Sequence, residues 1–341
     1  MKLSQAKAIA TEAVKSAMAL SPTARDAQYV VPYFISGAGL GKTSTAQQIA
    51  NDLDVPIVIL SLAQYDYSEI AGWTLPNEDK SKMVRVRPDW MPEDGKGIIF
   101  LDELPQAPVT NQNIAAQLVN ERRVGPHKLP DGWVVMAAGN RTSDRAGTNI
   151  MPTHLRDRLM FLEVEADLED AIAYFSSVGV SDKVRAYLRF RPEWLHKFDV
   201  QENACPSPRS WERVSSILQW DIDEMCMTHA VAGQVGAAAT ADFMGFLKLF
   251  EVAPDIDKLI ADPEKADVPE DPAIMFAVSS AIASRMDKKN AANCLKYLTR
   301  LPQKEFIAFA VKDALSRDKS VASVDAVRKW ITSEGAMLAL S

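Results

Sequence analysis

Cysteine is scarce in this 341-residue chain, and long apolar runs and internal repeats are missing. The three cysteines, Cys205, Cys226 and Cys294, are scattered and odd in number. This argues against a disulfide framework and predicts reduced thiols in a cytoplasmic protein. No stretch approaches about 18 uninterrupted apolar residues, so no membrane-spanning helix is predicted. No low-complexity tract is present, and the composition is that of an ordinary globular protein.

Positive charge is also in deficit, because 38 Lys and Arg residues stand against 45 Asp and Glu residues, a net charge of -7. This balance gives no electrostatic reason to expect general nucleic-acid binding, although it leaves room for a local basic patch. The first residues read MKLSQAKAIATEAVKSAMALS and end in small side chains, as a signal peptide does. Glu12 and Lys15 interrupt their apolar part, so an amphipathic helix is predicted instead.

Short apolar runs organise the first half of the chain. They cover residues 32–35, 56–60, 97–101, 133–138 and 159–164, with helix-like or irregular segments between them. This alternation predicts an α/β domain with a mostly parallel sheet over residues 1–166, including the N-terminal helix. A helical domain is predicted for residues 167–250, an acidic, proline-containing connector with at most one short helix for 251–272, and further helices for 273–341.

A glycine-rich stretch, ISGAGLGKTS, follows the first predicted strand and precedes a helix-like segment. It matches the phosphate-binding template G-x-x-x-x-G-K-[ST], except that Ser36 stands at the first glycine. Lys42 would supply the cation and Thr43 a hydroxyl group for magnesium. The plainer alternative, a glycine-rich turn that happens to contain lysine, fits the flanking strand and helix less well. The predicted phosphate-binding residues are Gly37, Ala38, Gly39, Leu40, Gly41, Lys42, Thr43 and Ser44.

Polar side chains end two later predicted strands. GIIFLDELPQ places Asp102 and Glu103 at a carboxyl strand end, where α/β sheets bind ligands. Asp102 can hold magnesium and Glu103 can polarise a water molecule, which favours a hydrolase over a kinase that excludes water. Without the glycine-rich stretch upstream, Asp102 and Glu103 could simply begin a turn. WVVMAAGNRTSD ends its strand in Asn140, which can hold the water or a γ-phosphate oxygen, or can serve the turn only.

Arginines supply the remaining signals. Arg156 and Arg158 precede the last predicted strand, in THLRDRLMF. In CPSPRSWERV, Ser207 is predicted to cap a helix that starts at Pro208, which places Arg209 in the first turn. The helix dipole disfavours a cation there by a few tenths of a kcal/mol, and a bound anion would offset that cost. Each arginine taken singly could equally be a solvated surface residue.

In this order the parts resemble the AAA+ ATPases, and more narrowly the MoxR group. LDELPQAPVTNQNIAAQLVNERRVG is similar to that group's Asp-Glu strand, proline-containing turn and Gln-containing helix. DYSEIAGW resembles its Asp-Ile-x-Gly element, and AGTNIMPTHLRDRLMFLEV resembles its Gly…Leu-Pro…Asp-Arg-Phe segment. The resemblance covers residues 31–236 and says little about the rest of the chain.

The resemblance implies roles for the matching residues at the predicted phosphate site. Lys42 and Thr43 resemble the Walker A pair, and Asp102 and Glu103 resemble the Walker B pair. Asn140 resembles the sensor-1 residue. The implied ligands are ATP and Mg²⁺.

It also implies roles for the arginines. Arg158 matches the arginine finger, with Arg156 as a close competitor, and Arg209 resembles the sensor-2 arginine. Three departures from the family pattern concern Ser36, which replaces a P-loop glycine, Gln106, which stands where the family usually has arginine, and Leu159, which stands where it has phenylalanine.

The family has an inserted β-hairpin facing the ring pore, in the region of WTLPNEDKSKMVRVRPDWMP. There Lys80, Lys82, Arg85 and Arg87 lie among apolar residues. This segment can grip an acidic partner or a polypeptide, or it can form no more than a solvated face.

The resemblance implies an ATP-hydrolysing homo-oligomeric ring, taken as a hexamer, that remodels or activates a protein partner in a chaperone-like manner. It also implies a partner with a von Willebrand factor A domain. Two alternatives stay open. A nucleic-acid motor or loader could share the core, but the acidic charge and the lack of a recognisable DNA-binding module argue against it. A slow-turnover, nucleotide-gated scaffold is hinted at only by Ser36 and Gln106.

Overall fold

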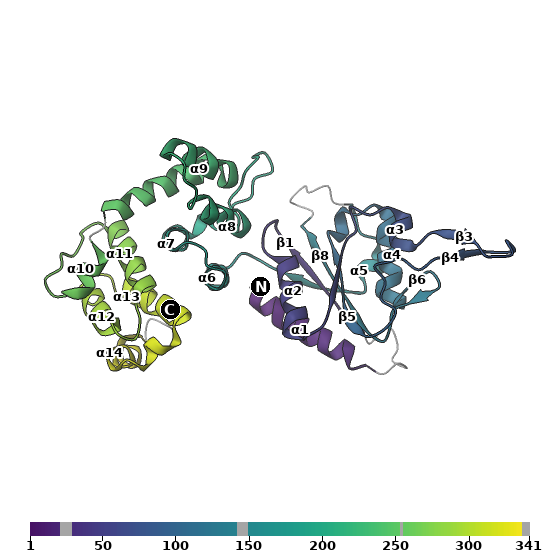
Figure 1. Cartoon of the computed structure of the whole chain (residues 1–341), viewed down its shortest axis with the longest axis horizontal. Helices are drawn as coiled ribbons and strands as arrows, with labels where there is room; N and C mark the ends of the chain where they lie inside the picture. Colours follow the sequence, from purple (N-terminus) through teal and green to yellow (C-terminus); the bar gives the residue numbers. More distant parts are fainter. Residues whose placement is uncertain (21–28, 142–148, 253–254, 336–341) are drawn as a thin grey trace. The chain divides into compact units, whose positions relative to one another are not determined.

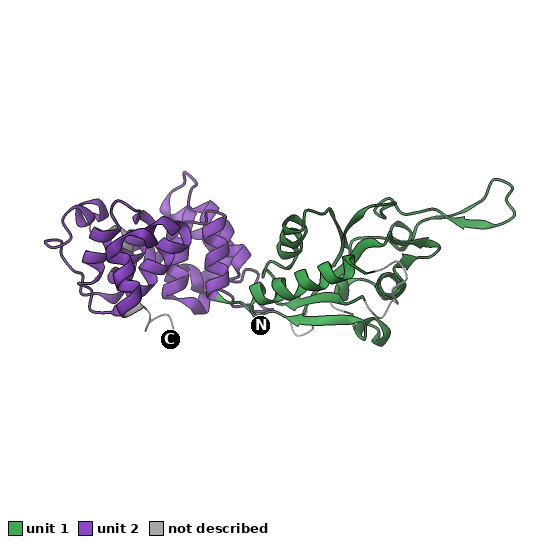
Figure 2. Cartoon of the chain, turned by 90° about the horizontal axis from the view of Figure 1, so that it is seen from below, with its two compact units in different colours: residues 1–167 green, residues 168–341 purple. Residues whose placement is uncertain are grey.

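The computed structural model describes residues 1–20, 29–141, 149–252 and 255–335 (Figure 1). The chain divides into two compact units, Met1–Asp167 and Leu168–Ser341 (Figure 2). Each unit has its own buried apolar side chains. Residues 142–148, part of the segment that resembles the MoxR group, lie outside the described residues.

A five-stranded parallel sheet forms the first unit, in the order β2-β5-β8-β1-β9. Its strands are β1 (Val31–Ser36), β2 (Ile57–Ser61), β5 (Lys96–Asp102), β8 (Gly132–Asn140) and β9 (Leu159–Glu163). Each apolar run picked out in the sequence coincides with one of these strands. The predicted α/β fold with a parallel sheet is therefore confirmed.

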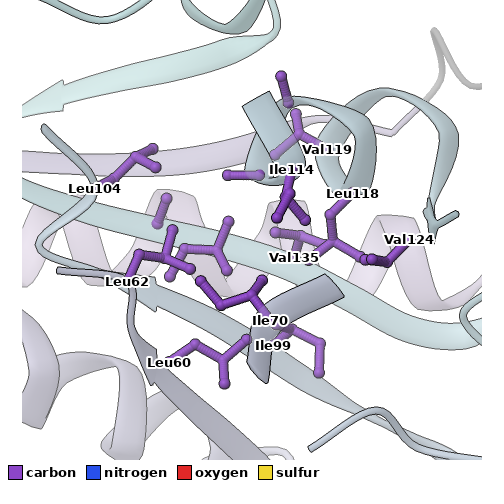
Figure 3. Packing of buried hydrophobic residues seen from close by; sticks show 14 of the residues in the cluster. Leu60, Leu62, Ile70, Ile99, Leu104, Ile114, Leu118, Val119, Val124 and Val135 are labelled. Carbon is purple, nitrogen blue, oxygen red and sulfur yellow. The ribbon is translucent and has the colours of Figure 1, made fainter. Parts of the chain in front are cut away.

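Alternating side chains cover both faces of this sheet. Along β5, Ile98 and Phe100 point to one face, whereas Ile99 and Leu101 point to the other. Both sets are fully buried, which explains why a central parallel strand reads as a continuous apolar run. Figure 3 shows the second face, where Ile99 packs with side chains from the neighbouring strands and helices.

Helices occupy the two faces separately. The helices α1 (Leu3–Met18) and α2 (Lys42–Asp52) share one apolar cluster with the sheet. On the other face lie α3 (Tyr67–Ala71) and α4 (Val109–Glu121), followed along the chain by α5 (Thr153–Arg156). α1 buries Ala6, Ala10, Val14 and Ala17, a helical stripe of small residues that allows close approach to the sheet. The predicted amphipathic N-terminal helix is present.

Two short antiparallel hairpins accompany the sheet. One pairs β3 (Thr74–Pro76) with β4 (Met83–Arg85), and the other pairs β6 (Arg123–Val124) with β7 (His127–Lys128). The β3–β4 hairpin extends away from the sheet in Figure 2 and occupies the place predicted for the insertion. His127 Nε2 lies 2.9 Å from the Arg85 carbonyl oxygen and so links the two hairpins.

In the described part of the second unit, the regular elements are all helices. The α-helices are α6 (Leu168–Ser177), α7 (Asp182–Phe190), α8 (Pro208–Ile217), α9 (Glu224–Val252), α10 (Ile256–Ala261), α11 (Pro272–Arg285), α12 (Ala291–Leu298), α13 (Lys304–Arg317) and α14 (Asp325–Trp330). One apolar cluster surrounds Trp211 and a second surrounds Tyr297. Phe276 of α11 belongs to the first cluster and stacks on Phe309 of α13, with ring centroids 4.8 Å apart.

One segment, Glu224–Lys248, is long and apolar enough by length and composition to cross a membrane. Gly236 interrupts α9 there with φ 80 and ψ 163, values outside the helical region. Neither half of the helix then reaches the roughly 20 residues that a span requires. Val231, Val235 and Phe243 are buried in the cluster around Trp211.

Candidate nucleotide-binding site

The loop between β1 and α2 turns on two glycines. Gly39 and Gly41 have φ values of 78 and 79, in the left-handed region that glycine adopts without a Cβ penalty. Gly41 is the residue before α2, so Lys42 and Thr43 occupy the first helical turn. Backbone amides in the first turn have no partner within the helix, and this geometry suits an anion.

Lys42 points back across this loop toward the strand ends. Its ammonium nitrogen lies 2.9 Å from Ser36 Oγ, 3.1 Å from the Gly37 carbonyl oxygen and 2.8 Å from Asn140 Oδ1. Ser36 and Asn140 face each other across β1 and β8, so two neighbouring strands supply acceptors to one cation. Lys42 and Asn140, both placed by the sequence at the carboxyl ends of strands, are therefore joined by a direct hydrogen bond.

Thr43 and Asp102 bring two oxygen atoms to one point. Thr43 Oγ1 donates a hydrogen bond to Asp102 Oδ2 at 2.5 Å. Among the described residues, no group of three or more His, Cys, Asp or Glu residues could hold a metal ion. One carboxylate and one hydroxyl nevertheless fit Mg²⁺, which commonly takes few protein ligands and completes its shell with water and phosphate oxygens.

Glu103 occupies a strained backbone position directly after β5. Its φ of 55 and ψ of 32 are left-handed, which costs a non-glycine residue on the order of 1–3 kcal/mol. Its amide donates to Asp102 Oδ1 at 2.9 Å, and its carboxylate accepts a hydrogen bond from Ser61 Oγ at 3.0 Å. The turn therefore gives the two adjacent carboxylates different partners: Asp102 accepts a hydrogen bond from Thr43, and Glu103 accepts one from Ser61.

Ser61 is the site residue that no sequence motif indicated. It ends β2 and lies opposite Asp102 in the sheet register. A polar residue at the end of a predicted strand, next to the Asp-Glu strand, is the signal that could have identified it.

Gln106 lies in the short 3-10 turn Leu104–Gln106, and its buried Oε1 has no hydrogen-bond partner among the described residues.

Arg156 and Arg158 lie at and just after the end of α5 in the first unit. Arg158 is exposed, donates to the His154 carbonyl oxygen at 3.2 Å and pairs with Asp157 at 3.5 Å. Arg156 ends α5, is exposed, and forms no side-chain hydrogen bond or ion pair with the described residues. The structure thus gives neither arginine a polar contact with Lys42, Thr43 or the carboxylates in the described part of the first unit.

Arg209 belongs to the second unit. Ser207 caps α8 by accepting a hydrogen bond from the Ser210 amide at 3.2 Å, and Pro208 begins the helix, as predicted. Arg209 follows in the first turn and is exposed. Within the described residues, its side chain forms no hydrogen bond or ion pair.

The sheet order, the glycine loop and the strand-end carboxylate define a P-loop NTPase fold. Residues 32–163 match the family model AAA, described as the ATPase family associated with various cellular activities. This part of the first unit is therefore similar to AAA-family domains, and the match supports ATP binding and hydrolysis in general terms.

Comparison with curated proteins gives no match. Two solved structures illustrate the structural likeness. The Thermotoga maritima RuvB Holliday junction branch migration motor shares 14% identity at a TM-score of 0.40, covering 78% of this chain and 76% of that chain. NtrX from Brucella abortus in complex with ATP shares 14% identity at a TM-score of 0.38, covering 99% of this chain and 67% of that chain.

Proposed function

We propose that this chain is a Mg²⁺-dependent ATP hydrolase of the AAA+ MoxR type. In this proposal it assembles into a homo-oligomeric ring, hexameric by family resemblance, and remodels or activates a protein partner. The observation that carries the ATPase assignment is the meeting of Lys42, Thr43, Asp102, Glu103 and Asn140 at one edge of the sheet.

Each of these side chains then has a distinct task. Lys42 binds phosphate oxygens as a point charge. Thr43 and Asp102 would hold Mg²⁺, whose chemistry is to neutralise charge on the phosphate oxygens. Glu103 orients and polarises the attacking water, while Ser61 fixes one of its carboxylate oxygens at 3.0 Å. Asn140, bonded to Lys42, is placed to hold the water or a γ-phosphate oxygen.

The β3–β4 hairpin is our candidate for contact with the protein partner. Leu75 and Val84 are paired across the hairpin, and Val86 donates a backbone hydrogen bond to Trp73. These four apolar side chains therefore share one face, and Trp73 is 65% exposed. Lys82, at the tip, adds positive charge beside them. Exposed apolar groups of this kind suit contact with a polypeptide, and the family resemblance makes a von Willebrand factor A domain protein our candidate for it.

A cytoplasmic location also belongs to the proposal. Cys205, Cys226 and Cys294 are free thiols, which fits a reducing compartment.

The direct test compares ATP binding and hydrolysis in the wild type, Lys42→Ala and Lys96→Ala. Lys96 is an exposed lysine that begins β5, at the opposite end of the strand from Asp102, so its removal controls for the lost charge. We expect Lys42→Ala to lose ATP binding and Lys96→Ala to keep it. Wild-type protein without ATPase activity, or Lys42→Ala with unchanged affinity, would overturn the assignment.

The nucleic-acid alternative is tested in the same assay. If the partner is a protein, single- or double-stranded DNA should leave the ATPase rate unchanged at low and moderate salt. A several-fold stimulation that weakens as salt rises would instead support a nucleic-acid motor, because phosphate contacts release counterions.

A further inference from the structure

We infer that Ser36 is a positioning residue for Lys42. Its hydroxyl group fixes the lysine ammonium group at the base of the loop, at the position where the phosphate-binding template has glycine. The inference rests on the proposed function, in which Lys42 contacts the phosphates of ATP. Ser36, which departs from the glycine of the template, is then itself a part of the nucleotide-binding site.

The direction of the hydrogen bonds follows from the chemistry of the groups. A lysine ammonium group has three donors and no acceptor, so Ser36 Oγ accepts from Lys42 at 2.9 Å. The Ser36 hydroxyl donates its own hydrogen to the Gly37 carbonyl oxygen at 2.9 Å. Its lone pairs therefore remain available for Lys42. Such a chain of hydrogen bonds is mutually reinforcing.

Burial makes this anchor rigid. Ser36 is 0% exposed, and it ends β1, a strand paired on both sides. The other side-chain acceptor, Asn140 Oδ1 at 2.8 Å, belongs to a partly exposed residue on the adjacent strand. The two groups hold the ammonium group from neighbouring strand ends. Of the two, Ser36 has less freedom to move.

Glycine at position 36 would remove the hydroxyl acceptor and keep the main-chain carbonyl groups of the same loop. The Ser36 carbonyl oxygen is 3.5 Å from the Lys42 nitrogen and the Gly37 carbonyl oxygen is 3.1 Å away. The hydroxyl group adds a closer acceptor. A long, flexible lysine side chain held in place before a ligand binds loses less conformational entropy on binding.

The expected kinetic consequence is a change in affinity rather than in turnover. Loss of pre-organisation weakens substrate and transition-state complexes equally, so KM rises while kcat is maintained. For Ser36→Ala we expect the dissociation constant and the KM for ATP to rise about tenfold, with kcat within about twofold. Ser36→Gly, which restores the template residue, should weaken binding at least as much.

The first experiment needs no nucleotide. Thermal unfolding is measured for the wild type, Ser36→Ala, Lys42→Ala and the double variant, which together form a double-mutant cycle. Ser36→Ala should lower the melting temperature by about 2–4 °C in the wild-type background. It should lower it by less than half as much when Lys42 is already alanine. Equal shifts in both backgrounds would mean that Ser36 acts through packing alone and would overturn the inference.

The second experiment measures ATP affinity and steady-state kinetics for Ser36→Ala and Ser36→Gly. Thr45→Val is the control, because Thr45 is also a buried hydroxyl residue that donates to a loop carbonyl oxygen, that of Gly41, at 2.9 Å. It should cost stability without raising the KM beyond about twofold. Tighter ATP binding by Ser36→Gly would show that the hydroxyl competes with phosphate and would overturn the inference.

The two experiments separate the inference from the proposed function. A wild-type protein that binds no ATP refutes the function, while the unfolding cycle still measures the coupling of Ser36 to Lys42. A wild-type protein that hydrolyses ATP, with no coupling in the cycle and an unchanged KM in Ser36→Ala, refutes the inference alone.

Discussion

Thr43 Oγ1 donates a hydrogen bond to Asp102 Oδ2 at 2.5 Å, although the two residues are 59 positions apart in the chain. β8 lies between β1 and β5 in the sheet, so the first turn of α2 reaches past the end of β8 to meet β5. This contact joins the glycine loop to the strand-end carboxylates. It is the arrangement on which a shared magnesium ligand pair depends.

Divalent cations should therefore be required for hydrolysis. Chelation by EDTA should abolish ATPase activity, and added Mg²⁺ should restore it. Asp102→Asn should raise the Mg²⁺ concentration for half-maximal activity by about 10–100-fold or more, because one anionic ligand is lost. Asp94→Asn is the control, since Asp94 is exposed and precedes the amino end of β5. Equal Mg²⁺ requirements in the two variants would contradict this assignment.

Glu103→Gln should separate binding from turnover. The amide keeps the size of the side chain but cannot polarise water as a carboxylate does, so kcat should fall about 10²–10⁴-fold while ATP affinity is maintained. Ser61→Ala should have a smaller effect in the same direction, because Glu103 keeps its charge but loses the bond that orients it. Single-turnover hydrolysis and nucleotide binding measure the two quantities. A wild-type rate in Glu103→Gln would remove Glu103 from the mechanism.

Local patterns in the sequence predicted the strands and most of the site. Buried parallel strands require unbroken apolar runs, and ligands gather at their carboxyl ends, so Asp102 and Asn140 could be located without coordinates. Ser61 could not be located in this way, because a serine after an apolar run is common. Its contact with Glu103 depends on the neighbouring strand, β5. The bond between Ser36 and Lys42 likewise depends on how the loop folds back.

The structure of the second, helical unit was harder to predict from the sequence. Residues 251–272 read as a connector with at most one short helix, and α10 is such a helix, but the sequence did not indicate that its Ile256 and Leu259 are buried in the cluster around Tyr297. Two apolar residues in an acidic stretch give a weak periodic signal, and the helices that cover them are remote in sequence.

A test of the fold alone concerns Gly139, which lies beside Tyr33 and Pro105. A Cβ atom on Gly139 would lie 2.3 Å from the Tyr33 hydroxyl oxygen and 2.4 Å from Pro105 Cδ. Because Tyr33 is fully buried, we expect Gly139→Ala to destabilise the protein by about 1–3 kcal/mol. Gly233→Ala is the control: its Cβ would meet nothing within 4 Å, and alanine favours the helix by up to about 1 kcal/mol. Chemical denaturation measures both.

Asp313 should be the most sensitive charged residue of the helical unit. Its carboxylate lies 2.8 Å from Arg189 and 3.5 Å from Arg185, and the Asp313 side chain is only 4% exposed. Arg185 also pairs with Asp182. Asp313→Asn would leave two largely buried arginines without this counter-charge, which should cost about 3–5 kcal/mol of unfolding free energy.

The adjacent residue provides the control. Lys312 pairs with Glu169 at 2.9 Å, but the Lys312 side chain is 68% exposed. Lys312→Ala should therefore cost no more than about 1 kcal/mol. Comparable losses in Asp313→Asn and Lys312→Ala would show that burial does not set the strength of these ion pairs.

The last prediction is that the active site is shared between subunits. Among the described residues, the polar contacts of the Arg158 side chain are with His154 and Asp157, and its exposed guanidinium leaves room for a second molecule. In the MoxR group, to which we propose that this chain belongs, the matching arginine faces the next subunit's nucleotide. An arginine delivered to the γ-phosphate can contribute about 10³–10⁵ in rate. Arg158→Ala should therefore be nearly inactive while binding ATP normally.

Mixing variants separates a shared site from an internal one. Arg158→Ala subunits keep Glu103, and Glu103→Gln subunits keep Arg158, so mixed rings would contain some complete sites. We expect each variant alone to be nearly inactive and their mixture to recover part of the ATPase activity, increasingly at higher protein concentration. Full activity in Arg158→Ala would transfer the role to Arg156, the exposed neighbour on α5. A dilute monomer as active as the assembled protein would contradict a shared site, because every catalytic group would then come from one chain.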